Sequence, residues 1–217
     1  LGGNLNQRPR CWYYRHPLVQ CLKKGGDRCY ALPGNSKYLC VTGGDRCYIV
    51  HPSDTAVALT ALGASVEIAG PGGRSVGPGH SLRTVPIEQY FVGPGEDLTR
   101  ENILTPGELV TRVFLPLLPA PSPQIPPNPP LQRGDGGISI SFQRSLYLKA
   151  GERESGDFAL VSVAAALAVE AGNIRIAAVV LGGVAPVPYR AGQVEQYLQG
   201  KDIGEVDPAL AGSLALP

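Results

Sequence analysis

The placement of the cysteines constrains this chain more than any other feature. Thiols kept only as small core residues would be scattered, and an odd number cannot form a closed set of disulfides. Their spacing lacks the C-x2-C pairs that are typical of zinc ribbons, but four thiolates suit either zinc or an iron–sulfur cluster. The sequence therefore predicts a thiolate metal site with one cysteine to spare. All five cysteines lie in the first quarter of the 217 residues, at Cys11, Cys21, Cys29, Cys40 and Cys47.

Composition limits the classes of fold and partner. The 28 glycines and 21 prolines make up nearly a quarter of the chain, which predicts many turns and short strands. A formal net charge of +1 offers no electrostatic reason for binding nucleic acid or an anionic membrane. No apolar run approaches the roughly 20 residues that span a bilayer, and the first residues do not resemble a secretory leader. Because methionine is absent even at position 1, we expect a fragment or a processed product.

Residues 1–52 show no sustained period and are predicted to be irregular. The first helix is predicted over residues 53–63, where Ser53 can cap the N-terminus, Asp54 suits the first turn and Gly63 ends the helix. The other elements of this half are expected to be short. They are strands at 64–68, 82–85 and 108–115, a turn at 70–74 and a short helix at 86–90.

A proline-rich segment separates the two halves. Eight of the 21 prolines fall between Pro116 and Pro130, so this stretch can be neither a helix nor an inner strand. It is predicted to be a polyproline II linker or an insertion, and we favour a solvated loop over a docking site for a proline-recognising domain. The second half predicts strands followed by helices, so the whole chain indicates an α+β fold. These elements are strands at 141–149, 158–169 and 174–181, a hairpin turn at 170–173, and helices at 191–198 and 208–214.

Several motifs carry a more specific signal. The glycines of the opening GGN triplet let backbone N–H groups approach an anion closely, although such triplets are also common in structural turns. The segments GGNLNQRPRCWYYR, CYIVHPSDTAVALTALGASVEIAGPGG, ILTPGELVTRVFLP, YLKAGERESGDFALVSVAAAL and LGGVAPVPYRA follow one another in that order. Together they resemble the FAD-binding medium subunit of the molybdenum hydroxylases, the superfamily of xanthine dehydrogenase and carbon monoxide dehydrogenase. The resemblance covers the chain except residues 119–138.

The Cys-rich stretch is most similar to the branch that contains 4-hydroxybenzoyl-CoA reductase and periplasmic aldehyde oxidoreductase, in which an insertion holds an extra [4Fe-4S] cluster. Cys40 falls where the family usually has another residue, so it is the spare. The alternatives are that the thiols are buried small side chains, or that zinc replaces iron and sulfur. The three histidines form no metal-binding pattern, and we expect His51 to pack in the HPSD turn. The residues that match the family's cluster ligands are Cys11, Cys21, Cys29 and Cys47.

The resemblance also implies an FAD site. The Gly-Gly-Asn turn matches the family's second flavin loop, whose backbone contacts the pyrophosphate and ribityl groups. The aspartate of HPSD matches the acid that binds the ribityl hydroxyls, unless it serves only as a first-turn helix acid. The leucine of GELVT matches the residue next to the isoalloxazine ring, with a core strand leucine as the alternative. The lysine of YLK would stabilise negative charge on reduced flavin, unless it is a solvated strand-end lysine. These residues are Gly2, Gly3, Asn4, Asp54, Leu109 and Lys149.

The resemblance further implies a place in a larger assembly. Residues 1–115 would form the second lobe of a PCMH-type FAD-binding domain, 116–139 the linker or insertion, and 140–217 a C-terminal domain of the CO dehydrogenase flavoprotein type. The implied function is electron transfer in an oxidoreductase, with a molybdopterin-binding large subunit and a [2Fe-2S] small subunit as partners. The implied compartment is the cytoplasm, or the periplasm through a partner's signal.

The family's first flavin loop does not occur in this sequence. Half of the pyrophosphate cradle is then missing, so we expect weak or no FAD binding by the isolated chain. Two rival hypotheses remain, a non-catalytic truncated remnant and a thiolate metal-binding module without flavin activity.

Overall fold

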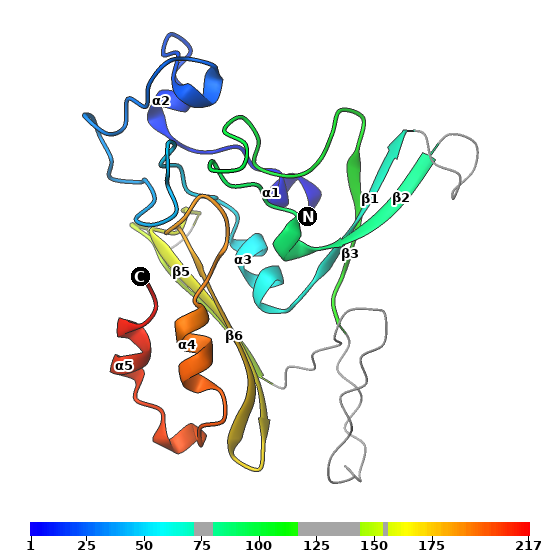
Figure 1. Ribbon diagram of the computed structural model, residues 1–217, viewed down its shortest axis with the longest axis vertical. Coiled ribbons are helices and arrows are strands. Elements are labelled where there is room, and N and C mark those ends of the chain that lie inside the picture. Colours follow the sequence, from blue (N-terminus) through cyan, green and yellow to red (C-terminus); the bar gives the residue numbers. More distant parts are fainter. Residues whose placement is uncertain (72–79, 117–143, 154–155) are drawn as a thin grey trace.

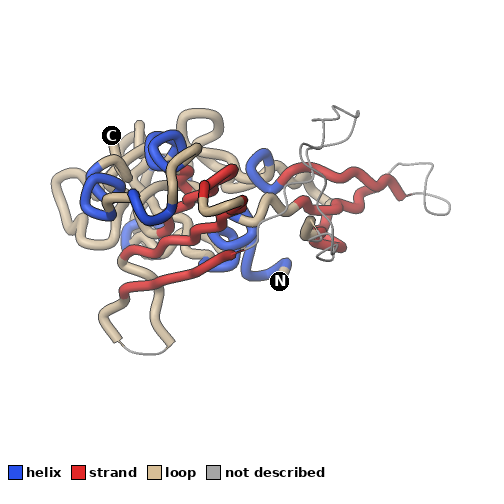
Figure 2. Tube along the Cα trace, turned by 90° about the horizontal axis from the view of Figure 1, so that it is seen from below, coloured by secondary structure: helices blue, strands red, loops and turns tan. Residues whose placement is uncertain are grey.

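The computed structural model describes residues 1–71, 80–116, 144–153 and 156–217. Within these ranges the chain forms two antiparallel sheets with a helix between them (Figure 1). Figure 2 shows the two sheets beside each other along the molecule rather than stacked face to face. The predicted α+β class is confirmed. In the described part, no helix is long and apolar enough to cross a membrane.

The first sheet has the strand order β2-β1-β3, and its central strand β1 pairs antiparallel with both neighbours. The register places Val66 of β1 opposite Val85 of β2 and Val113 of β3. Val66 and Ile68 are buried, as expected for an inner strand with one face on the core. The strands are β1 (Ser65–Pro71), β2 (His80–Pro86) and β3 (Leu109–Phe114).

The second sheet has the order β4-β5-β6-β7 and is antiparallel throughout. The alternation along β5 sends Val163 toward helix α4 on one face and Ala164 toward helix α3 on the other. Ala171 and Gly172, with φ of 49° and 85°, form the two-residue hairpin turn between β5 and β6. The elements are β4 (Arg144–Ala150), β5 (Val161–Glu170), β6 (Asn173–Gly182), β7 (Tyr189–Arg190), α4 (Gly192–Leu198), η3 (Ile203–Glu205) and α5 (Pro208–Ser213).

Helix α3 (Asp54–Ala61) contributes to the cores of both sheets. One side of the helix packs Ala56 and Leu59 against the first sheet. The other side packs Val57 and Ala61 against the second sheet. A helix that is apolar on both sides must be covered on both sides, and here each sheet covers one of them. The regions expected before and after the linker therefore share a helix.

The helices and strands predicted from the sequence are confirmed where the structure describes them, with ends displaced by a few residues. The turn predicted at 70–74 is wrong for residues 70 and 71, which continue β1 and pair with β2. Ser53 caps α3, because its Oγ accepts a hydrogen bond from the Ala56 N–H at 3.0 Å, and Gly63 follows the helix with a φ of 64°. The predicted turn at 70–74 lies partly outside the described residues, as does the proline-rich segment 116–139. The irregular first quarter contains the short helices α1 (Gly2–Leu5), α2 (Trp12–Arg15) and η1 (Leu22–Lys24), and the helix predicted at 86–90 is η2 (Ile87–Gln89).

The Cys-rich region is fixed to the second sheet by backbone hydrogen bonds. The N–H groups of Val41 and Thr42 both donate to the Val184 carbonyl, at 2.9 and 3.2 Å. The His51 N–H donates to the Ala185 carbonyl at 3.1 Å. These contacts hold the cysteines and the HPSD turn beside the loop between β6 and β7.

Candidate functional site

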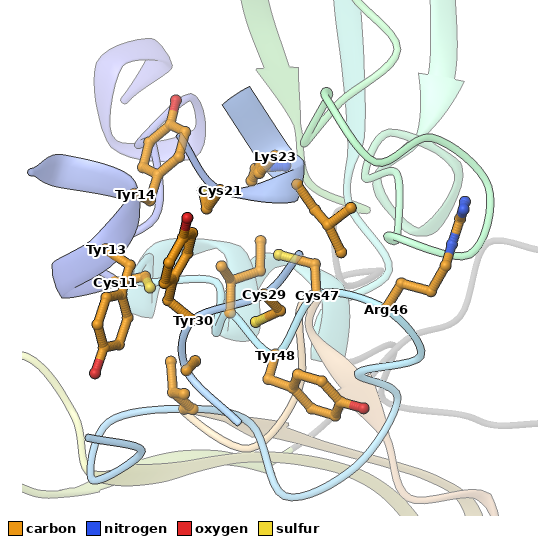
Figure 3. A pocket seen from close by; sticks show the side chains of 14 residues that line it. Cys11, Tyr13, Tyr14, Cys21, Lys23, Cys29, Tyr30, Arg46, Cys47 and Tyr48 are labelled. Atoms are coloured by element: carbon orange, nitrogen blue, oxygen red, sulfur yellow. The ribbon is translucent and has the colours of Figure 1, made fainter. Parts of the chain in front are cut away.

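Four of the five cysteines line one pocket, here called the thiol pocket. Figure 3 shows their side chains around the same space, with tyrosines around them. Two of these thiols are buried and two are partly buried. Cys40 is not part of the lining, and its Sγ lies against Gly44, where an added Cβ would be 2.9 Å away. The four lining cysteines are the four predicted ligands, Cys11, Cys21, Cys29 and Cys47.

A tight loop brings Cys21 and Cys29 to the same pocket. The Gly26 N–H donates to the Cys21 carbonyl at 2.9 Å, and the Leu22 N–H donates to the Arg28 carbonyl at 3.1 Å. A Cβ on Gly26 would lie 2.0 Å from the Gln20 carbonyl oxygen, so the loop closes this tightly only with glycine at that position. The sequence therefore specifies the approach of two thiols that are eight positions apart.

Electrostatics in the thiol pocket disfavour free thiolates. Burial raises the pKa of Cys47 to about 11, while the Lys23 ammonium acts in the opposite direction. Burial also raises the pKa of Cys11, and the neighbouring thiols of Cys21 and Cys29 add to that rise. Without a bound cation these side chains therefore stay protonated, and they would become thiolate ligands only if a metal ion or cluster lowered their pKa on binding.

The donors of the thiol pocket match an iron–sulfur cluster in type and number, whereas the space between them, about 20 Å³, would have to widen to hold one. Four cysteine thiolates are the ligand set of a [4Fe-4S] cluster, and each would bind a different iron, so they must surround a space rather than meet at a point. A single zinc ion instead needs its four sulfurs at about 2.3 Å from one position. Among the described residues, no three Cys, His, Asp or Glu side chains are grouped so as to hold one metal ion.

A second and larger pocket, of about 620 Å³, lies between the Cys-rich region and the second sheet. We call it the Asp54 pocket. A volume of this size is typical of small-molecule and cofactor sites. Leu39 lines both pockets, and Cys11 of the thiol pocket stands between Arg10 and Trp12, which line the Asp54 pocket. The two cavities are therefore neighbours.

Two predicted cofactor-binding residues meet at the edge of the Asp54 pocket. Lys149 Nζ, on β4, donates to Asp54 Oδ2 at 2.7 Å and to the Asp157 carbonyl at 2.6 Å. Asp54 stands at the start of α3, so its carboxylate also lies at the favourable end of the helix dipole. Asn4 approaches the same helix start, because its Oδ1 accepts from the Ser53 hydroxyl at 2.6 Å.

The glycines and the leucine of the predicted FAD site lie outside the lining of this pocket. Gly2 and Gly3 belong to the short helix α1, and a Cβ added to Gly3 would have no neighbour within 4 Å. Leu109 begins β3 opposite Ala69 and is 60% exposed. The alternative that Leu109 is an ordinary core leucine is therefore wrong.

Buried polar atoms without well-aligned hydrogen bonds also mark the Asp54 pocket. Among the described residues, His51 Nε2 and Ser162 Oγ, which belong to lining residues, and the nearby Tyr147 hydroxyl are buried and make no well-aligned hydrogen bond. Polar groups do lie near them, since Ser162 and Asp54 act on the pKa of Tyr147 and the Leu5 backbone acts on that of His51. Burial lowers the pKa of His51 to about 4 and raises that of Tyr147 to about 12, so both side chains are neutral. A ligand rich in hydroxyl and carbonyl groups would give these atoms better-aligned partners. The polyol chain and ring edge of FAD fit this description.

The sequence predicted only part of this pocket. His51 packs in the HPSD turn as expected, since it is buried and its Nδ1 accepts from the Ser53 N–H at 3.4 Å. Ser162 and Tyr147 were not predicted. The available signal was the serine itself, a polar residue on the α3-facing side of an otherwise apolar strand.

Family comparisons match both parts of the chain. Residues 1–118 match the FAD binding domain in molybdopterin dehydrogenase, and residues 146–215 match the CO dehydrogenase flavoprotein C-terminal domain.

Two curated relatives are similar over most of the chain. The aldehyde oxidoreductase FAD-binding subunit PaoB of Escherichia coli (strain K12) is 37% identical over 191 residues, which cover 87% of this chain and 50% of the relative. The glyceraldehyde dehydrogenase medium chain of Sulfolobus acidocaldarius is 30% identical over 153 residues, which cover 70% of this chain and 42% of the relative. The chain thus spans about half the length of the curated relatives it matches.

Solved structures show the same fold. The structure of reconstituted CO dehydrogenase from Oligotropha carboxidovorans matches with a TM-score of 0.51 and 26% identity, over 76% of this chain and 45% of that one. Quinoline 2-oxidoreductase from Pseudomonas putida 86 matches with a TM-score of 0.52 and 20% identity, over 94% of this chain and 60% of that one. The latter similarity concerns the fold alone.

Proposed function

The chain belongs to the family of FAD-binding subunits of molybdopterin dehydrogenases, and on that premise we propose that it passes electrons between a molybdenum-containing partner and an external acceptor. In this proposal FAD binds in the Asp54 pocket and a [4Fe-4S] cluster binds in the thiol pocket. When bound, FAD and the cluster supply the redox chemistry, and the protein supplies position and electrostatics.

One observation carries the proposal: the two pockets are neighbours. The backbone at Cys11 separates them, with the Cys11 thiol on the thiol pocket and the flanking Trp12 on the Asp54 pocket. Two redox groups held in these cavities would be separated by little more than one layer of side chains. That arrangement suits electron transfer and has no evident use in a remnant without a flavin role.

The predicted cofactor-binding residues receive distinct roles, although only Asp54 lines the pocket itself. The Asp54 carboxylate would accept hydrogen bonds from the ribityl hydroxyls, and Lys149, already paired with it, would offset negative charge near the ring. FAD would have to extend beyond the Asp54 pocket, past the start of α3, for its pyrophosphate to meet the backbone of Gly2, Gly3 and Asn4. Leu109 would cover the ring, and its exposure leaves its side chain free for that contact.

The partners in the proposal are a molybdopterin-binding large subunit and a [2Fe-2S] small subunit. The names of the relatives support this, since one is called a FAD-binding subunit and the other a medium chain. We propose the cytoplasm as the compartment, with the periplasm as the alternative if a partner carries an export signal.

The flavin part of the proposal is tested by titrating FAD into the purified chain and following flavin fluorescence. We expect weak but saturable binding that Asp54→Ala weakens about tenfold, since a hydrogen bond to a charged group contributes about 1.5–3 kcal/mol. Glu96→Ala is the control, because Glu96 is exposed and lines neither pocket. Equal affinity of the Asp54→Ala variant and the unchanged chain would refute the ribityl role.

The cluster part is tested by iron and acid-labile sulfide analysis of anaerobically purified protein. We expect Cys29→Ser to lose the cluster and Cys40→Ser to retain it, because only the first thiol lines the pocket. Protein with zinc and no iron would support the thiolate module instead. Loss of the cluster in Cys40→Ser, with retention in Cys29→Ser, would contradict the ligand assignment.

A further inference from the structure

A buried group of charges lies behind the thiol pocket. The side chain of Lys23, on η1, is 1% exposed, and its Nζ donates to the carbonyls of Leu98 and Arg100 at 3.0 and 3.1 Å. The same Nζ forms an ion pair with Glu101 Oε1 at 2.8 Å. The other oxygen of Glu101 pairs with Arg8 Nε at 3.0 Å.

The residue that carries the buried cation of this group also belongs to the lining of the thiol pocket. Lys23 lines the thiol pocket, and Figure 3 shows it beside Cys21 on the same wall. Its ammonium is close enough to act on the Cys47 thiol. The Glu101 side chain is 7% exposed, whereas that of Arg8 is 53% exposed and more screened by solvent. The pocket therefore has Lys23 in its wall, with the ammonium turned toward the Glu101 carboxylate and the carbonyls of Leu98 and Arg100.

The stability of the fold alone does not explain why a lysine and a glutamate are buried at this position. Taking a lysine and a glutamate out of water costs several kcal/mol per ion, and apolar residues of similar volume often stabilise a fold as well or better. The loop that carries Cys21 could be anchored to residues 98–101 by apolar contacts. A buried charge pair is useful where the electrostatic potential itself matters, as it does beside an anionic redox group.

We propose that the Lys23–Glu101 pair sets the reduction potential of the iron–sulfur cluster assigned to the thiol pocket. The inference rests on the proposed function. Reduction adds one electron to the group in the pocket, and a nearby cation lowers the free energy of that more negative state. Lys23 raises the potential, and Glu101 limits the rise. Both are positioning residues, since neither is a ligand.

The pair predicts potential shifts of opposite sign. In a mediated redox titration followed by EPR, Lys23→Met is expected to lower the midpoint potential of the cluster and Glu101→Gln to raise it. Each shift should correspond to at least a tenfold change in the equilibrium constant of one-electron reduction, about 59 mV. Arg46→Gln is the control, because Arg46 lines the same pocket but its side chain is 64% exposed, so it should shift the potential far less.

A purely structural role gives a different result. If the pair only anchors the loop, both variants lower the melting temperature and shift the potential in the same direction or not at all, and the inference is overturned. If Lys23→Met does not fold, the other two variants still test the inference. Glu101→Gln should raise the midpoint potential of the cluster, and Arg8→Gln should lower it slightly. Wild-type protein without iron would refute the proposed cluster itself, whereas an intact cluster with unmoved potential would refute only the tuning role.

Discussion

At the scale of single residues, His51 shows how the Asp54 pocket affects stability as well as binding. Its side chain is buried, packs edge-on against Phe91 with ring centroids 4.7 Å apart, and has a pKa of about 4 because burial disfavours the charged form. The unfolded chain binds a proton on this residue near pH 6.5, where the folded chain does not. The contribution of neutral His51 to stability is therefore present above pH 6.5 and is lost as the pH falls toward 4.

We predict that the free energy of unfolding falls between pH 7 and pH 4.5 by up to about 3 kcal/mol through this residue. His51→Asn, whose Oδ1 can still accept from the Ser53 N–H, should flatten that fall, and His16→Asn at an exposed position should not. Carboxylates act in a different window: Arg83 lowers the pKa of Glu108 to about 2, so its contribution is lost only below pH 4.5. Urea unfolding at several pH values measures this, and an unchanged slope in His51→Asn would contradict it.

Some residues of the candidate site can be identified from the sequence, and others cannot. The four lining cysteines were predicted as one ligand set, because each stands in a local motif that can be matched. Asp54 and Lys149 were predicted one by one, from separate motifs rather than as a pair. Lys23 and Glu101 were not predicted, because their meeting depends on two loops far apart in the chain, and a lysine or glutamate in a loop is ordinarily solvated. Local patterns indicate which residues bear chemistry, and only the fold shows which charges lie behind them.

At the scale of elements, the end of β6 is fitted closely beneath α3. Gly182 stands where a Cβ would be 2.4 Å from Ser162 Oγ and 2.6 Å from Val57 Cγ2. Glycine at this position lets the helix, which carries Asp54, approach the second sheet. The strands and the helix could be predicted from periodicity, but this contact could not, since the apolar stripe of the helix indicates only one buried side.

Gly182→Ala is expected to destabilise the protein by about 1–3 kcal/mol, because the added methyl group overpacks the contact between α3 and the second sheet. Gly192→Ala, in the first turn of α4 with nothing within 4 Å of its Cβ, should be neutral or slightly stabilising. Denaturant midpoints of the two variants test the difference. A Gly182→Ala midpoint equal to that of Gly192→Ala would mean that the helix moves aside without cost.

At the scale of the whole molecule, helix α3 connects the two sheets, which the proline-rich segment separates in the sequence. The proline-rich segment suggests two separate units, yet α3 precedes it and packs Val57 and Ala61 on the sheet that follows it. A hydrogen bond to a charged group also joins the parts before and after this segment, since the Tyr38 hydroxyl donates to Glu152 Oε2 at 2.8 Å. Composition could predict the linker, but the partner of an apolar helix face far along the chain could not be derived from it.

Removing residues 119–136 is therefore expected to leave the fold intact. Helix α3 packs on both sheets, and loop-closure entropy changes by only about 0.6 kcal/mol for each doubling of loop length. The melting temperature should change by less than about 4 °C, which corresponds to about 1 kcal/mol or less for a chain of this size. Fluorescence of Trp12, the single tryptophan, and far-UV circular dichroism should report one coincident transition. A large drop in melting temperature would mean that the deleted residues pack on the body, and two separate transitions would mean that α3 does not couple the two sheets.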